Sequence, residues 1–211
     1  MLRSLDAIQR SSAIPLRIDE TNNVSCKGQP GVSNTFASAL WATDYIARAM
    51  AAGVGGLDFH DLIDRPGAYS PLVASNNGLH ANPEWYALVL AQRLAGSEAF
   101  RTTVRGAPNL NATGFLSAGG VVQIVLVNFD PTGSTPLLVR LRVPGRFARG
   151  TILRLTAPSA QATSQVKLGG REVTASGSWS ARLPLPGIYQ RRGSLAVSVP
   201  ASSAALVTLT P

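Results

Sequence analysis

Residues 15–20 read PLRIDE, a short run that suits a β-strand and ends in two carboxylates. From Ser33 to Ala52 apolar residues recur at helical spacing, and Gly53 stands where a glycine commonly ends a helix. Residues 54–59, VGGLDF, read as a second strand. A strand, a helix and a strand in this order are typical of the βα units of α/β proteins.

A further helix is predicted after this unit. Asn82, Pro83 and Glu84 provide a cap, a proline at the first helical position and an acid in the first turn. The helix is expected to run from Glu84 to Ala95 and to stop at Gly96. Residues 1–97 therefore alternate between helix and strand.

The chain changes character near Ser97. Residues 121–127, VVQIVLV, form an almost continuous β-branched run that suits a buried strand, and residues 137–143 alternate between apolar and polar. Further strands are expected at 150–155, 164–168, 194–199 and 204–209. Turn residues separate these segments at the spacing of a β-sandwich, which predicts a second domain over residues 98–211.

Composition limits the class of protein. Hydrophobic residues make up 45% and charged residues 14% of the 211 residues, which indicates a folded rather than a disordered chain. Cys26 is the one cysteine, so no disulfide within the chain is possible. The sequence shows no signal peptide and no apolar run of membrane-spanning length, so we expect no membrane partner, and the localisation is left open.

The positive charge lies in the second half. Residues 1–97 hold seven Lys and Arg against eight Asp and Glu, whereas residues 98–211 hold twelve against three, giving net charges of −1 and +9. Such a surface attracts nucleic acid, membrane surface and acidic polysaccharide alike. No nucleic-acid-binding motif accompanies the charge, so we expect no nucleic-acid partner.

Two strand ends carry the candidate chemistry. Glu20 ends the first strand, with Asn22 shortly after it, and His60 follows the second. Barrel enzymes place reactive side chains at the C-terminal ends of strands, and a carboxylate there suits a glycosidic nucleophile. Alternatively, Glu20 caps a loop or pairs with Arg17. Two histidines and one cysteine are too few to predict a zinc site.

A longer stretch strongly resembles glycoside hydrolase family 79, which contains β-glucuronidases and heparanase. The resemblance is carried by residues 17–26, RIDETNNVSC, and 28–41, GQPGVSNTFASALW. It continues through shorter runs at 56–60, 69–72 and 84–88, and weakly at 166–170 and 184–187.

The resemblance implies a (β/α)8 TIM barrel whose seventh strand delivers Glu20 as nucleophile and whose eighth ends near His60. Residues 1–97 would be the C-terminal part of this catalytic barrel, and residues 98–211 the antiparallel β-sandwich that follows it. It implies a retaining hydrolase of β-glucuronide or related β-glycoside linkages, with no cofactor. Full-length relatives are often secreted.

The proton donor is expected to be missing from this chain. In relatives it is a glutamate that follows an asparagine on the fourth strand, and no Asn-Glu pair occurs here. Glu84 is a poor substitute because it starts a helix. The chain is therefore expected to be inactive alone and to depend on an N-terminal barrel half as its partner.

Substrate contacts follow from the same resemblance. Tyr69 matches a tyrosine that contacts the sugar carboxylate, and His60 and Asn22 would line the sugar pocket. Glucuronate-binding relatives have an aromatic residue and glycines where this chain has Ser25, Cys26 and Lys27, so Lys27 could supply charge to the carboxylate instead. For Lys27, Tyr69 and His60 the alternatives are a solvated lysine, ordinary loop packing and a structural histidine.

A different class of function is a non-catalytic carbohydrate-binding module for acidic glycans. The basic β-sandwich would then hold the glycan. The arginines concerned are Arg140, Arg142, Arg146, Arg149 and Arg154. Since the strands alternate, some of these side chains are expected simply to face solvent.

Overall fold

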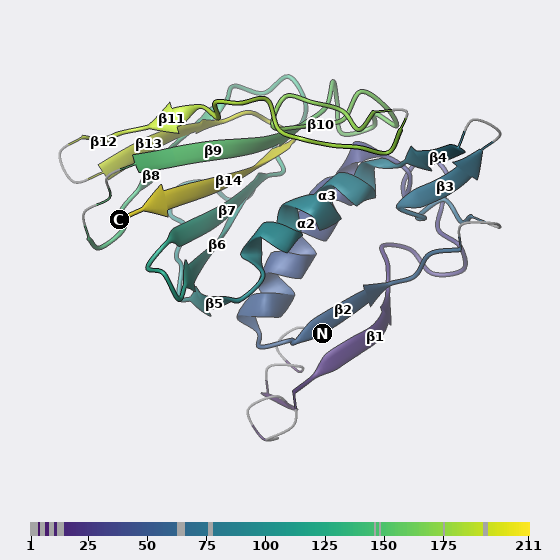
Figure 1. Ribbon diagram of the computed structural model, residues 1–211, viewed down its shortest axis with the longest axis horizontal. Helices are drawn as coiled ribbons and strands as arrows, with labels where there is room; N and C mark the ends of the chain where they lie inside the picture. The colour runs from purple at the N-terminus through teal and green to yellow at the C-terminus, as the bar shows by residue number, and fades with distance from the viewer. Residues whose placement is uncertain are drawn as a thin grey trace.

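Two parts of the chain differ in how their strands pair, as the computed structural model shows (Figure 1). The structure describes residues 15–62, 66–75, 78–145, 147, 149–174, 176–191 and 194–211, together with positions 4, 7, 8 and 11. The first part contains parallel strands and helices, and the second contains antiparallel strands.

The predicted βαβ unit is present. Strand β1 (Arg17–Thr21) pairs in parallel with β2 (Gly56–Phe59), and α2 (Phe36–Ala51) connects them. The apolar periodicity starts at Ser33, but the helix itself begins at Phe36, because Thr35 has the extended capping conformation. Gly53 follows the helix with φ of +82°, which explains the glycine at that position.

A hairpin and a second helix follow. Strands β3 (Leu72–Ser75) and β4 (Gly78–Ala81) pair in antiparallel fashion and lead into α3 (Pro83–Ala91). The expected continuation to Ala95 is a 3-10 turn, η1 (Gln92–Leu94). Asn82 holds the cap position, but its side-chain amide donates to the Ser70 carbonyl, 2.7 Å away, and so ties the helix to the loop before the hairpin.

The second part forms two antiparallel sheets. The larger has the order β10-β9-β14-β7-β6-β5, with β11 also paired to β9, and the smaller has the order β12-β13-β8. The strands of the larger sheet are β5 (Ser97–Phe100), β6 (Leu110–Ser117), β7 (Val122–Asn128), β9 (Arg149–Thr156), β10 (Lys167–Leu168), β11 (Gly187–Ile188) and β14 (Ser203–Thr210). Those of the smaller are β8 (Leu137–Leu141), β12 (Gln190–Arg191) and β13 (Ser194–Val199). The strand expected at 164–168 is much shorter than predicted, because Gln165 has φ of +58°, outside the β region.

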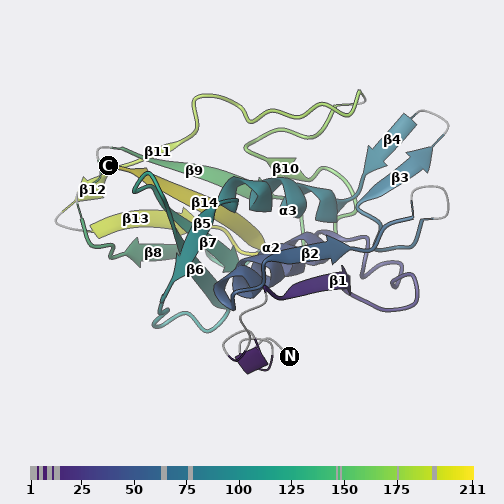
Figure 2. The ribbon, with the colours of Figure 1, turned by 60° about the horizontal axis from the view of Figure 1, so that its bottom comes forward.

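The core has two layers on either side of the large sheet. On one face, Phe36 and Leu40 of α2 and Leu90 of α3 pack with Phe115 and Leu206 of the sheet. On the other, residues such as Leu126 and Val207 pack with Val197 and Leu195 of the small sheet. The helices therefore lie between the large sheet and the β1–β2 pair (Figures 1 and 2). No helix in the described part of the chain is long and apolar enough to span a membrane.

Candidate active site

The ends of β1 and β2 meet at one edge because the two strands run parallel. Glu20 lies near the end of β1, and His60 follows directly after β2. The Nδ1 atom of His60 is 3.2 Å from Oε1 of Glu20, and the Glu20 side chain is 75% exposed. The structure therefore brings together two residues that are forty positions apart and leaves the carboxylate open to solvent.

Backbone contacts fix this pair. The amide of His60 donates to the Thr21 carbonyl at 2.9 Å, and Nδ2 of Asn22 donates to the His60 carbonyl at 3.1 Å. Oδ1 of Asn22 in turn accepts a hydrogen bond from the amide of Asn23. Asn22 thus joins the two strand ends.

Tyr69 completes the group that we term the strand-end cluster: Glu20, Asn22, His60 and Tyr69. The His60 and Tyr69 rings meet edge to face, with centroids 5.7 Å apart, and Tyr69 is 7% exposed. A Cβ on Gly28, whose φ is +76°, would lie 2.9 Å from the Tyr69 amide nitrogen, so glycine lets the two loops pack closely.

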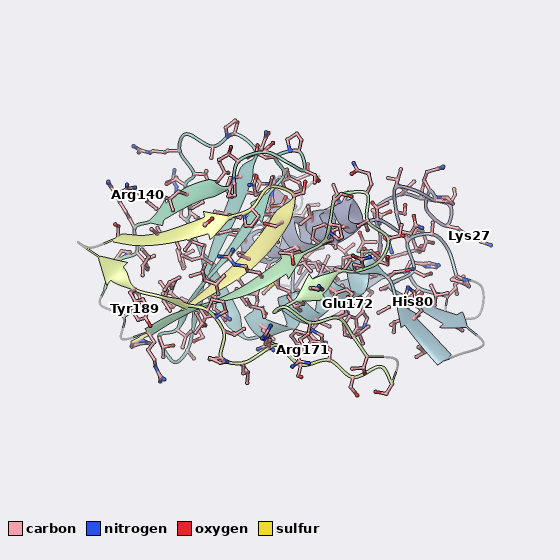
Figure 3. The ribbon with its side chains drawn as sticks, turned by 90° about the horizontal axis from the view of Figure 1, so that it is seen from above. Lys27, His80, Arg140, Arg171, Glu172 and Tyr189 are labelled. Carbon is pink, nitrogen blue, oxygen red and sulfur yellow. The ribbon has the colours of Figure 1, made fainter. Side chains whose placement is uncertain are left out.

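Ser25 and Lys27 lie in an exposed turn beside the strand-end cluster. The Gly28 amide donates to the Ser25 carbonyl, and the Ala68 amide donates to the Lys27 carbonyl at 2.7 Å. The Lys27 side chain points outward at the end of the molecule (Figure 3). Among the described residues, neither side chain hydrogen-bonds to the cluster, so their part in substrate binding stays a prediction.

Arg17 does not pair with Glu20. Its Nη2 atom lies 2.9 Å from Oδ2 of Asp58 on β2, and its Nε atom lies 3.9 Å from Oδ1 of Asp19. This exposed ion pair leaves Glu20 with His60 as its neighbour. The alternative in which Glu20 serves as a partner for Arg17 is therefore wrong.

Glu84 is a buried acid that the sequence interpretation treated as a helix start. The residue is 1% exposed, and neither carboxyl oxygen has a hydrogen-bond partner in the described part of the chain. Burial raises the pKa of Glu84 to about 8, nearby Asp61 adds to the rise, and Asn22 opposes it. Glu84 is therefore a mostly neutral carboxylic acid at pH 7.

Within the described residues, no three His, Cys, Asp or Glu side chains gather as a metal site. The arrangement offers acid–base and nucleophilic chemistry through an exposed carboxylate held beside an imidazole.

Known proteins resemble the chain in both sequence and fold. Residues 113–206 match the glycosyl hydrolase family 79 C-terminal β domain. A β-glucuronidase of Neurospora crassa is 25% identical over 150 residues, which cover 64% of this chain and 26% of the relative. The chain thus spans about a quarter of that relative's length.

Solved structures agree on the fold. The 4-O-α-L-rhamnosyl-β-D-glucuronidase of Fusarium oxysporum 12S superimposes with a TM-score of 0.79 and 20% identity, covering 99% of this chain and 49% of that one. A family 51 arabinofuranosidase of Xanthomonas axonopodis pv. citri superimposes with a TM-score of 0.65 and 16% identity. The match covers 97% of this chain and 43% of that one. Over residues 113–206 the chain is therefore similar to glycosyl hydrolase family 79, and the whole described chain shares the fold of a solved glycoside hydrolase.

Proposed function

We propose that this chain supplies the nucleophile of a retaining β-glucuronidase, and that Glu20 is that nucleophile. The observation that carries the proposal is the 3.2 Å contact between Glu20 and His60 at the shared end of two parallel strands. In this proposal β1 and β2 are the seventh and eighth strands of a (β/α)8 barrel, where strand ends hold the reactive groups.

The chemistry follows the double displacement of retaining glycosidases. A Glu20 oxygen attacks the anomeric carbon, and the glycosidic C–O bond breaks as a second carboxylic acid protonates the departing oxygen. Water, deprotonated by that same second group, then cleaves the glycosyl ester and frees Glu20. His60 and Asn22 would orient the carboxylate and the loop that carries it, because both contact the ends of β1 and β2.

The relatives support a β-glucuronide as substrate, since the Neurospora protein is named a β-glucuronidase and the Fusarium enzyme a rhamnosyl-glucuronidase. Tyr69 is the proposed contact for the sugar carboxylate because its ring packs against His60. Lys27 and Ser25 are proposed as outer contacts from the neighbouring turn.

The second carboxyl group, which acts as proton donor, has no suitable candidate among the described residues. Retaining enzymes hold the two carboxyl groups about 5–5.5 Å apart, both open to the substrate. Both Glu84 oxygens are buried, as is one oxygen of Asp61, and Asp19 and Asp58 contact Arg17. We therefore propose that the proton donor comes from outside this chain and that the 211 residues alone do not turn over substrate.

Release of p-nitrophenol from p-nitrophenyl β-D-glucuronide tests this point. We expect none from the purified chain or from Glu20→Gln, with circular dichroism showing both to be folded. Turnover that disappears in Glu20→Gln would support the nucleophile and contradict the missing donor. Turnover that persists in Glu20→Gln would contradict the role of Glu20.

One observation favours acidic-glycan binding as a second function. A groove of about 580 Å³ beside β8 is lined by four exposed arginines and no acid: Arg101, Arg105, Arg140 and Arg142. Arg154 instead donates to the Ser198 carbonyl at 2.7 Å, and Arg146 lies outside the described residues. Figure 3 places Arg140 at the opposite end of the molecule from Lys27, so the two functions would use separate surfaces.

Binding of a uronate oligosaccharide at low and high salt tests that groove. We expect affinity that falls steeply with salt and is reduced in Arg140→Gln, because charge would provide the attraction. Glu20→Gln should bind equally well. Salt-independent binding, or no loss in Arg140→Gln, would contradict this role.

A further inference from the structure

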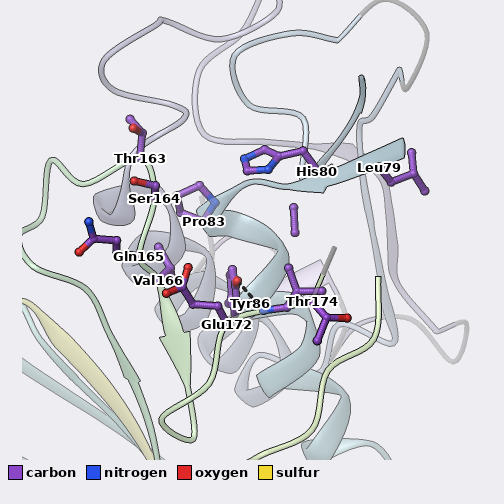
Figure 4. A pocket seen from close by; sticks show the side chains of 12 residues that line it. Leu79, His80, Pro83, Tyr86, Thr163, Ser164, Gln165, Val166, Glu172 and Thr174 are labelled. Atoms are coloured by element: carbon purple, nitrogen blue, oxygen red, sulfur yellow. Dashed lines mark hydrogen bonds between the residues drawn. The ribbon is translucent and has the colours of Figure 1, made fainter. Parts of the chain in front are cut away.

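A cavity of about 240 Å³ with mixed polar and apolar walls lies apart from the strand-end cluster, and neither Glu20 nor His60 lines it. Its walls come from four segments: the β3–β4 hairpin, the first turns of α3 and the loops at 163–166 and 172–174 (Figure 4). Parts of the chain that are about ninety residues apart therefore enclose one space.

Tyr86 supplies a hydrogen-bond donor to this cavity. The residue is 4% exposed, and its hydroxyl oxygen accepts a hydrogen bond from the Val173 amide at 3.0 Å. Because the oxygen is the acceptor in that contact, its own hydrogen is left to donate. Burial and the nearby Glu172 carboxylate raise the pKa of Tyr86, which keeps the phenol protonated.

His80 and Glu172 face the same space from different walls. Figure 4 shows the imidazole of His80 above the cavity, on the hairpin, and the carboxylate of Glu172 on the side of the sandwich loops. Both residues are exposed, and among the described residues neither side chain has a hydrogen bond or an ion pair. The cavity thus presents the Glu172 carboxylate as an acceptor, the Tyr86 hydroxyl hydrogen as a donor, and the His80 imidazole.

We propose that this cavity binds a single neutral sugar unit, as a site separate from the cleavage at Glu20. Sugar hydroxyls both donate and accept, which matches Glu172 and Tyr86, and the apolar side chains of Pro83 and Val166 can cover a C–H face of the ring. Pockets for drug-sized molecules measure about 300–1,000 Å³, so this smaller space suits one ring.

The charge of Glu172 selects against an acidic sugar. A uronate would bring a second carboxylate next to this one, and like charges at close range are unfavourable. The cavity therefore complements the proposed glucuronide site, because it would take a neutral unit of the same or another glycan. The inference goes beyond the proposed function and does not depend on Glu20.

The test is an NMR titration of the ¹⁵N-labelled 211-residue chain with methyl β-D-glucopyranoside, xyloside and galactoside, and with methyl β-D-glucuronide. We expect the Val173 amide to shift with at least one neutral glycoside and millimolar affinity, and about tenfold weaker binding of the glucuronide. Glu172→Gln should weaken binding of the neutral sugar about tenfold, since the sugar hydroxyl would then donate to a neutral acceptor instead of a charged one.

Controls separate this site from the others. Glu98→Gln changes another exposed acid, on β5, and should leave the titration unchanged, as should Glu20→Gln. Tyr86→Phe should also weaken binding. Glu172→Gln is the variant less able to disturb folding, because Glu172 is exposed and Tyr86 is buried. An unmoved Val173 amide with all three neutral glycosides, equal binding in Glu172→Gln, or tighter binding of the glucuronide would overturn the proposal.

Discussion

Residues 15–95 and residues 97–211 differ in how completely their strands are buried. Every residue of β7 is buried and the strand has neighbours on both sides, whereas β1 and β2 contain no buried residue. The candidate nucleophile stands on the poorly covered pair, beside an exposed turn. The strands of the second part are therefore well covered, whereas the proposed nucleophile lies on strands that contribute little to the core.

The largest expected effect is the loss of unfolding free energy when a leucine is truncated, which should differ between the two parts. Leu126→Ala removes a 0% exposed side chain from the sandwich and should lower the free energy of unfolding by about 2–5 kcal/mol. Leu57→Ala on half-buried β2 should cost less than about 1.5 kcal/mol. Urea unfolding of both variants measures the difference. Equal losses would show that β2 is as well packed as β7.

The next effect is a pH dependence of the free energy of unfolding that arises from Glu84 in the first part. The pKa of folded Glu84 is about 8, above its ordinary value of 4.5, so the folded state binds more protons than the unfolded state between these values. The stabilisation from neutral Glu84 is complete below about pH 4.5 and is lost as the pH rises through 8. We expect a fall on the order of 4 kcal/mol across this range.

Glu84→Gln tests this prediction because it keeps a neutral side chain of the same shape. Unfolding free energies measured from pH 4.5 to 8 should show a much smaller slope than in the unsubstituted chain. Glu98→Gln, at an exposed acid, should keep the original slope. A slope that survives in Glu84→Gln would assign the pH dependence to other groups.

A smaller effect lies where the two parts meet. Nε2 of Gln123 on β7 donates to the Arg93 carbonyl at 2.8 Å, and its Oε1 accepts from the Ser97 hydroxyl at 3.1 Å. Gln123→Ala should cost about 1–2 kcal/mol, because buried polar groups lose their partners. Ser97→Ala, which removes one bond, should cost less. If Gln123→Ala has no effect on urea unfolding, water replaces these contacts.

Periodicity predicted much of the fold. The alternation of β1, α2 and β2 and the buried run of β7 could be read from apolar spacing, because neighbouring side chains alternate or recur every turn. Strand β6 was not predicted, since Asn111, Thr113 and Gly114 interrupt its apolar pattern. In the structure Phe100 on β5 packs over Gly114, a cross-strand contact that one strand's sequence cannot show.

The candidate site was predictable in part. Glu20 and His60 could be named because each lies at the end of a strand, and parallel strands end at one edge. The burial of Glu84 could not, because an acid in a first helical turn ordinarily faces solvent and interacts with the helix dipole. Its environment comes from the loop after β2, near Asp61, and from Asn22 beyond β1.

Covalent trapping tests the central claim most directly. With 2,4-dinitrophenyl 2-deoxy-2-fluoro-β-D-glucuronide the leaving group needs no proton donor, so an intact nucleophile can react even in a chain that lacks the second carboxyl group. Mass spectrometry of the digested chain should find the fluoroglucuronosyl ester on Glu20, and none in Glu20→Gln. A label on another carboxylate, or no label on a folded chain, would contradict the assignment of Glu20 as the nucleophile.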